Sequence, residues 1–163
     1  MGIRGLVSCL ALVALAGCGS DSPTAPTPTF INMVGGWAGT FTSNLNFPNV
    51  PGGNQSENCT VSWNITSQNG GQFSGTWQLT DGTIACASSG TLTGTIDTGG
   101  AITSFSAGTT VGPLGVAGCT RTNASPWVGR VSATSVNLST TEQWSCAELG
   151  AGAVGRDIAL TKR

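Results

Sequence analysis

The side chains that most often carry catalysis are scarce in this chain. Its 163 residues include no histidine, which removes the imidazole base and the Ser-His and Cys-His pairs of many hydrolases. No P-loop or dinucleotide-type glycine motif occurs in a strand–helix setting. The carboxylates are scattered, mostly at turns, and they are Asp21, Glu57, Asp81, Asp97, Glu142, Glu148 and Asp157. A paired-carboxylate glycosidase is the enzymatic alternative that remains, but we expect no enzyme, no cofactor and no metal.

Glu142 and Arg156 are the two charged residues whose positions suggest a buried site. Glu142 shares the inward parity of Leu138, and Arg156 shares that of Ile158. If the alternation of each strand continues, the two side chains form an ion pair inside a barrel opening. If the alternation breaks near the strand ends, both face water. Trp144 lies close to Glu142 in the sequence and is a further candidate for this opening.

The tryptophans have two interpretations. Together they would form an aromatic cup for a flat or sugar-like ligand, or they belong to the core, which is the commoner place for Trp in a strand. The residues concerned are Trp63, Trp77, Trp127 and Trp144. Of these, Trp144 is the one that we expect to be exposed.

Alternating apolar and polar residues predict an all-β domain of about eight strands. The strands are expected at about 34–43, 59–68, 73–79, 92–96, 101–107, 127–131, 136–138 and 158–160. Ile102 and Phe105 have opposite parity, which indicates a bulge or an outward apolar residue. Eight antiparallel strands close well into an up-and-down barrel, and a two-sheet β-sandwich is the alternative.

The connections between these strands differ in length. Short turns are expected near 69–71, 98–100 and 134–135, and long loops at 44–58, 81–88, 108–125 and 145–154. Connections alternate between the two ends of an up-and-down barrel. All long loops therefore fall at one end, and both ends of the domain fall at the other.

Four cysteines of the domain lie at this long-loop end. Cys59 and Cys86 bracket one hairpin, and Cys119 and Cys146 bracket another with the same spacing. A zinc site would call for C-x-x-C pairs or histidines, and the chain has neither. We therefore predict the disulfides Cys59–Cys86 and Cys119–Cys146, each stabilising the fold by roughly 3 kcal/mol.

The N-terminus follows the plan of an export signal. Arg4 precedes an apolar run over 5–14, which is too short to span roughly 30 Å of hydrocarbon. The run ends in Leu15-Ala16-Gly17-Cys18. This sequence resembles the lipobox of bacterial lipoproteins, which implies cleavage after residue 17 and acylation of Cys18. An ordinary secretory signal is the alternative.

The segment after the lipobox reads as a tether. Residues 18–33 comprise the lipidated Cys and a Pro/Thr-rich stretch that favours an extended conformation, and the domain is expected over 34–163. In the lipoproteins that the lipobox resembles, Gly at position 19 rather than Asp favours the outer membrane of a cell that has one. The resemblance thus implies a cell-envelope protein held to a membrane by lipid.

Gly35-Gly36-Trp37 near the start of the domain and Lys162-Arg163 at its end resemble the structural signature of calycins. That superfamily includes lipocalins, avidins and fatty-acid-binding proteins. The resemblance implies a barrel closed at one end by a cation stacked on Trp37. Arg163, or Lys162, would supply that cation.

Composition narrows the partners. The net charge is −1 and no run of basic residues occurs, so nucleic acid has little to attract it. We expect a non-enzymatic protein that binds an envelope protein, or has a structural role, through the loops at the membrane-distal end. The alternative is a small-ligand carrier of the calycin type.

Overall fold

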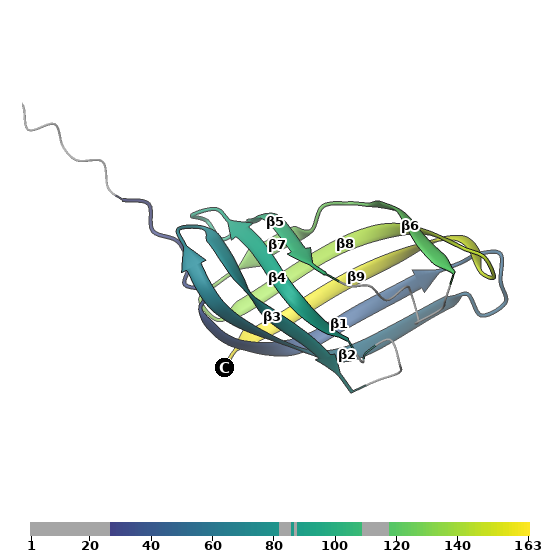
Figure 1. Cartoon of the computed structure of the whole chain (residues 1–163), viewed down its shortest axis with the longest axis horizontal. Helices are drawn as coiled ribbons and strands as arrows, with labels where there is room; N and C mark the ends of the chain where they lie inside the picture. The colour runs from purple at the N-terminus through teal and green to yellow at the C-terminus, as the bar shows by residue number, and fades with distance from the viewer. Residues whose placement is uncertain (1–26, 82–85, 87, 109–117) are drawn as a thin grey trace, which may run out of the picture.

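The computed structural model describes residues 27–81, 86, 88–108 and 118–163 (Figure 1). In these residues the regular structure is β-strand, with no α-helix. The strands are β1 (Gly35–Asn46), β2 (Asn54–Asn69), β3 (Gln72–Thr80), β4 (Ser89–Ile96), β5 (Ile102–Ala107), β6 (Cys119–Ala124), β7 (Val128–Val131), β8 (Ser135–Cys146) and β9 (Gly150–Lys162).

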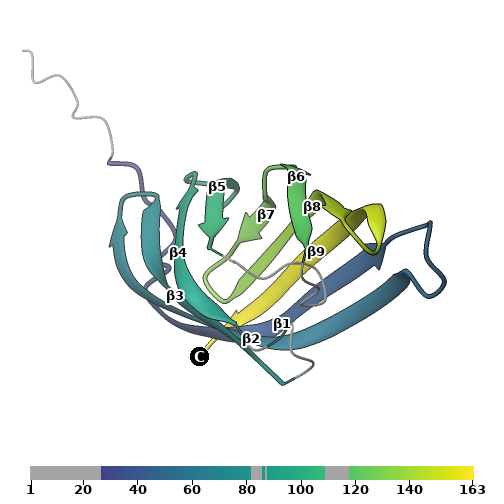
Figure 2. The same ribbon diagram turned by 45° about the vertical axis from the view of Figure 1, so that its right-hand side comes forward.

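All nine strands join one antiparallel sheet that curls into a half-barrel (Figures 1 and 2). The order is β5-β4-β3-β2-β1-β9-β8-β6, and β7 also pairs with β8. β6 and β7 therefore occupy one strand position in two pieces, which makes eight positions in the sheet. The predicted all-β antiparallel up-and-down architecture is confirmed. Because the sheet is continuous, the structure is not a two-sheet sandwich.

The two margins of the sheet meet at a single point. Ala101 forms an isolated antiparallel bridge to Arg130, and the Val131 amide donates to the Gly100 carbonyl oxygen at 2.7 Å. The expected irregularity at Phe105 is a bulge, because the β4–β5 register shifts between Thr95 and Ile96. We call the end of the sheet that contains the Ala101–Arg130 bridge and the turns at 70–71 and 98–99 the near end.

The chain before β1 packs across the near end instead of continuing the tether. Met33 is fully buried, and Phe30 and Ile31 pack against the core. The Gln68 side chain holds this segment, because its Nε2 donates to the Ile31 oxygen at 2.8 Å and its Oε1 accepts from the Met33 amide at 2.6 Å. The folded domain therefore includes residues 30–33, whereas the sequence predicts that it starts at residue 34.

The opposite end, which we call the far end, consists mainly of strand. Loops were expected over 44–58 and 145–154, but β1 and β2 pair as far as Asn46 and Asn54, and β8 and β9 as far as Cys146 and Gly150. These expectations are wrong because inward residues continue the alternation past the predicted strand ends. The two hairpins project beyond β3, β4, β5 and β7, and β6 runs beside β8 as far as Cys146 (Figure 2).

Two apolar clusters fill the concave side. The main core runs under most of the sheet and includes Trp37, Trp63 and Trp77. The far-end cluster lies between the projecting hairpins and comprises Leu45, Phe47, Trp144, Cys146 and Val154. Glycines make close packing possible, since a Cβ on Gly39 would collide with the Ala159 backbone and one on Gly94 with the Phe73 ring.

Candidate functional site

Glu142 is a buried carboxylate on β8, and its side chain is only 7 % exposed. Its Oε2 accepts hydrogen bonds from Arg156 Nε at 2.7 Å and from Trp144 Nε1 at 3.1 Å. Its Oε1 accepts one from Arg121 Nη1 at 2.9 Å. Three strands, β6, β8 and β9, thus supply one charged cluster, which we call the Glu142 cluster.

The ion pair between Glu142 and Arg156 is the arrangement that strand parity predicts, and the alternative in which both face water is wrong. The Arg156 side chain is 11 % exposed, and its guanidinium carbon lies 5.6 Å from the centre of the Phe41 ring. This contact adds a cation–π interaction to the ion pair. β9 aims the side chain inward because Arg156 keeps the parity of Val154 and Ile158, which are both buried.

Arg121 is the member of the cluster that the sequence did not reveal. It lies on β6, inside a segment expected to be a loop, and pairs with Trp144 across the β6–β8 ladder. Its side chain is 52 % exposed, so its ion pair with Glu142 is screened by water and contributes little stability. Every residue of β6 after Cys119 is exposed, so no apolar pattern marked this strand.

The electrostatics of the cluster keep Glu142 ionised. Burial by itself would raise the pKa of Glu142, but the charge of Arg156 opposes it. Hydrogen bonds from Arg156, Arg121 and Trp144 also favour the carboxylate, and the net result is a pKa below its ordinary value. With two guanidinium groups on one carboxylate, the cluster has a net positive charge. A fully bonded carboxylate with a low pKa is suited to holding strands together rather than to proton transfer.

The tryptophans belong mainly to the core. Trp63, Trp77 and Trp144 are all at least nine-tenths buried, so the expectation that Trp144 is exposed is wrong. It packs in the far-end cluster, where Gly152 opposite it on β9 leaves room for the Phe47 ring.

Aromatic rings also cross the interior toward the margins of the sheet. Phe105 of β5 stacks on Trp63 with ring centres 5.1 Å apart. Trp127, just before β7, meets the same Phe105 edge-on at 5.4 Å. These three rings fill part of the concave side near the margins.

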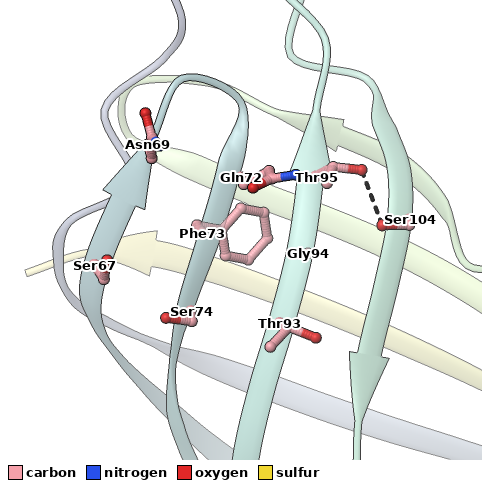
Figure 3. Close-up of a pocket in the computed structure, with 9 residues that line it drawn as sticks. All are labelled: Ser67, Asn69, Gln72, Phe73, Ser74, Thr93, Gly94, Thr95 and Ser104. Carbon is pink, nitrogen blue, oxygen red and sulfur yellow. Dashed lines mark hydrogen bonds between the residues drawn. The ribbon is translucent and has the colours of Figure 1, made fainter.

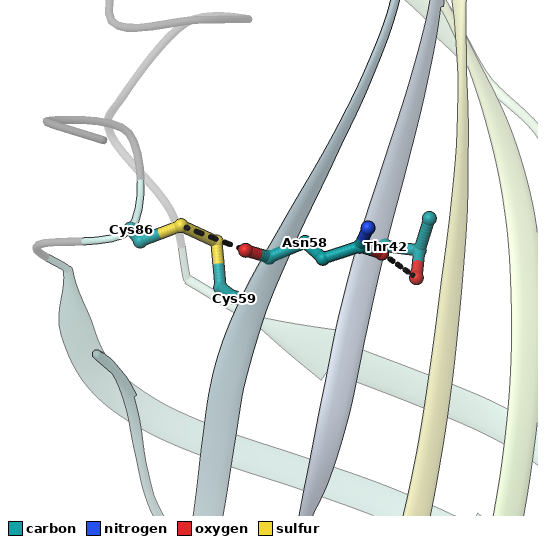
Figure 4. The surroundings of a disulfide bond; sticks show 4 residues. All are labelled: Thr42, Asn58, Cys59 and Cys86. Carbon is teal, nitrogen blue, oxygen red and sulfur yellow. Dashed lines mark hydrogen bonds between the residues drawn. A yellow bond between two sulfur atoms is a disulfide. The ribbon is translucent and has the colours of Figure 1, made fainter. Parts of the chain in front are cut away.

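Both predicted disulfides are present. Cys59–Cys86 and Cys119–Cys146 each span 27 residues. Cys119 and Cys146 face each other directly in the β6–β8 ladder, so this bond ties the outermost strand to the sheet. In Figure 4 the Cys86 sulfur lies near the Asn58 carbonyl oxygen, at 3.8 Å. This is a van der Waals contact, because a disulfide sulfur has no proton to donate.

Lys162 is the cation that covers Trp37 at the near end. Lys162 pairs with Trp37 across β1 and β9, and its Nζ lies 5.2 Å from the ring centre. The same Nζ donates to the Asn32 carbonyl oxygen at 2.8 Å, and Trp37 Nε1 donates to that of Met33. Arg163, the first choice from the sequence, lies beside Gly36 and lines a hollow on the outer face.

Several expectations fall on residues outside the described part of the chain. These are the signal over 1–17, the acylated Cys18, the loop residues 109–117 and, except for Cys86, the loop residues 82–87. Among the described residues, no group of three or more His, Cys, Asp or Glu is placed to hold a metal ion. The same part of the chain contains no helix long and apolar enough to cross a membrane.

The class that fold and site define is an all-strand antiparallel half-barrel, tied by two disulfides and compatible with a calycin-like barrel. Comparison with known protein families, with curated proteins and with solved structures found no match.

Proposed function

We propose that this protein is a lipid-anchored component of a bacterial cell envelope, which binds a partner at its far end without catalysing a reaction. The lipobox at Leu15-Ala16-Gly17-Cys18 supports the anchor. One acyl chain gives only marginal attachment to a bilayer, and two or more give a stable one. The Gly at position 19 favours the outer membrane.

The single observation that carries the binding role is the rigid projection at the far end. The β1–β2 and β8–β9 hairpins extend beyond β3, β4, β5 and β7, and β6 runs beside β8 as far as Cys146 (Figure 2). The two hairpins are joined by the pairing of β1 with β9 and by the far-end cluster between them, and the Glu142 cluster and the Cys119–Cys146 bond fasten β6 to the second hairpin. Binding groups on a stiff scaffold lose less entropy when a partner docks. The near end has less free surface, because the segment 30–33 packs across it.

The orientation follows from the strand order. β1 starts and β9 ends at the near end, since Trp37 pairs with Lys162. The tether leaves the domain on this side, so the far end points away from the membrane. The turns at 47–53 and 147–149 are then the parts of the domain that first meet a partner.

A calycin-type carrier is the second candidate. The lysine stacked on Trp37 supports it, because this pairing is the closure that the calycin resemblance implies. The Trp63–Phe105–Trp127 rings argue for a packed interior, since they occupy space that a ligand would need. We therefore favour binding of a partner at the far end.

The anchor is tested by Cys18→Ser in the native host. We expect the variant to leave the detergent phase in Triton X-114 partitioning, because acylation needs the thiol. The wild-type protein should enter that phase. A variant that partitions as the wild type does would show that another segment holds the membrane.

The binding face is tested with paired charge substitutions. Asn49→Lys and Glu148→Lys change exposed residues of the far-end turns, and Thr98→Lys changes an exposed residue of a near-end turn. Partners are cross-linked and purified from envelopes with wild-type protein. The far-end variants should weaken capture and the near-end variant should not. The reverse pattern would refute the proposed face.

A further inference from the structure

The outer face of β2, β3 and β4 carries uncharged polar side chains. Its outward residues are Ser, Thr, Asn and Gln, which present hydroxyls and amides to water. The strand registers align these groups in rows across three strands. Two neighbouring rows are Asn64, Thr76, Thr91 and Ser67, Ser74, Thr93.

This face is hollowed along its length. One hollow of about 360 Å³ includes the row of Ser74 and Thr93 (Figure 3). A second, of about 730 Å³, includes the row of Thr76 and Thr91. The two hollows share no lining residue, but they lie over successive rows of β3 and β4, and together we call them the outer groove. It follows β3 from Gln72 to Gln78, which is roughly 20 Å of extended strand.

The short outward side chains explain the hollow. Ser and Thr on β3 and β4 cover little of the backbone, while the large rings of β3 point inward. Phe73 is 3 % exposed and its ring lies beside Gly94 (Figure 3). The groove is therefore polar in its side chains although the strands beneath it carry the main core.

The charge of the outer groove restricts its ligand. Arg163 is the one charged side chain among its described lining residues. A divalent cation would need carboxylates, and nucleic acid would need several cations. The centre of a protein interface is commonly apolar and aromatic, which this surface is not. What remains is an uncharged ligand rich in hydroxyl groups, which can both donate to and accept from Ser, Thr, Asn and Gln.

We propose that the outer groove binds a neutral linear glycan along β3. The ligand's hydroxyls exchange hydrogen bonds with the rows of Ser, Thr, Asn and Gln, and the length of the groove accommodates an oligosaccharide of several units. The outer groove is separate from the far end, so the test of glycan binding does not depend on whether a partner binds at the far end. No aromatic ring of β2–β4 faces the groove, and binding is correspondingly weak.

The test is an NMR titration of the ¹⁵N-labelled full chain with cellohexaose, chitohexaose and hexagalacturonate. We expect one or both neutral sugars to shift backbone amides of β2–β4. The acidic sugar should bind no better than the neutral ones. Absence of shifts up to the solubility limit of both neutral sugars overturns the proposal, as do shifts confined to other strands or tighter binding of the acidic sugar.

Matched threonine variants locate the contact. Thr76→Val/Thr93→Val removes two hydroxyls but keeps β-branched side chains that suit a strand. It should weaken binding roughly tenfold or more, since each lost hydrogen bond is worth about 1 kcal/mol. Thr40→Val changes an exposed threonine on β1 outside the groove and should leave affinity unchanged. Equal effects of both variants would overturn the site. If the double variant does not fold, the single variants give the same comparison.

Discussion

Replacing Glu142 by glutamine removes the one negative charge of a cluster that joins three strands. Glutamine keeps the shape of the side chain, but its amide nitrogen is a donor placed among donors. Arg156 then loses its charged acceptor, and because its side chain is only 11 % exposed, water has little access to replace that acceptor. The substitution therefore measures the cost of an unpaired, largely buried guanidinium.

The magnitude follows from the exposure of each partner. Removing one member of a buried ion pair typically costs about 3–5 kcal/mol. The residual access of water to Arg156 places the expected loss near the lower value, about 3 kcal/mol. Arg121 is half exposed, and its pair with Glu142 adds less than about 1 kcal/mol. For a domain of ordinary stability, about 5–15 kcal/mol, this is a large loss.

Urea denaturation with both disulfides intact measures the effect, and a double-mutant cycle assigns it. Arg156→Met and Arg121→Met are combined in turn with Glu142→Gln. The coupling with Arg156 should exceed that with Arg121 by about 1 kcal/mol or more. A loss below about 0.5 kcal/mol, the usual range of surface substitutions, would refute the structural role. Stronger coupling to Arg121 would refute the assignment to Arg156.

The stability difference between the wild type and Glu142→Gln is expected to depend on pH. The pKa of Glu142 is lowered in the folded state, so its contribution is fully present above the unfolded pKa of Glu, about 4.3. The contribution is lost as the pH falls through the lower folded pKa. The stability difference between wild type and Glu142→Gln should thus be constant from neutral pH to about 5 and shrink below about 4. A difference that shrinks on raising the pH would contradict the sign.

Two further substitutions test the far end. Gly152→Ala should destabilise the protein by about 1–3 kcal/mol, because a Cβ there would lie within 2.6 Å of Phe47 Cγ. Thermal unfolding checks this, and the control is Gly108→Ala, whose Cβ would meet no atom of the described residues within 4 Å. Cys119→Ala/Cys146→Ala should lower the free energy of unfolding by about 3 kcal/mol in the chain-entropy account of a 27-residue link. A stability unchanged by removing this bond would show that β6 is held by its ladder alone.

Much of the fold could be predicted because its physics is local. Alternation marks strands whose inward residues are large, such as Phe73, Trp77 and Leu79 on β3. The disulfide pairing followed from the hairpins that the cysteines bracket. The inward position of Arg156 followed from parity alone, since a β-strand places every second residue on one face.

The remaining features depend on contacts that no local pattern records. The extension of β1 and β2 was read as a loop because the β2 residues that pair with Ser43 and Leu45 are Glu57 and Gln55, so no apolar alternation marks this part of β2. β6 is held by backbone pairing with β8 and by one disulfide. Met33 is buried because its side chain fills a space at the near end of the sheet. No pattern in the neighbouring residues of the chain indicates this burial.

The pairing of β1 with β9 has a consequence for how the chain folds. The first and last strands lie side by side in the interior of the sheet order, and they join positions 107 to 125 residues apart along the chain. The local hairpins β1–β2 and β8–β9 are able to form early, but neither can complete the half-barrel without the other. Such long-range pairing raises the contact order and slows folding. The sheet therefore closes only after the whole domain has been made, and until then both strands expose an edge that another chain could pair with.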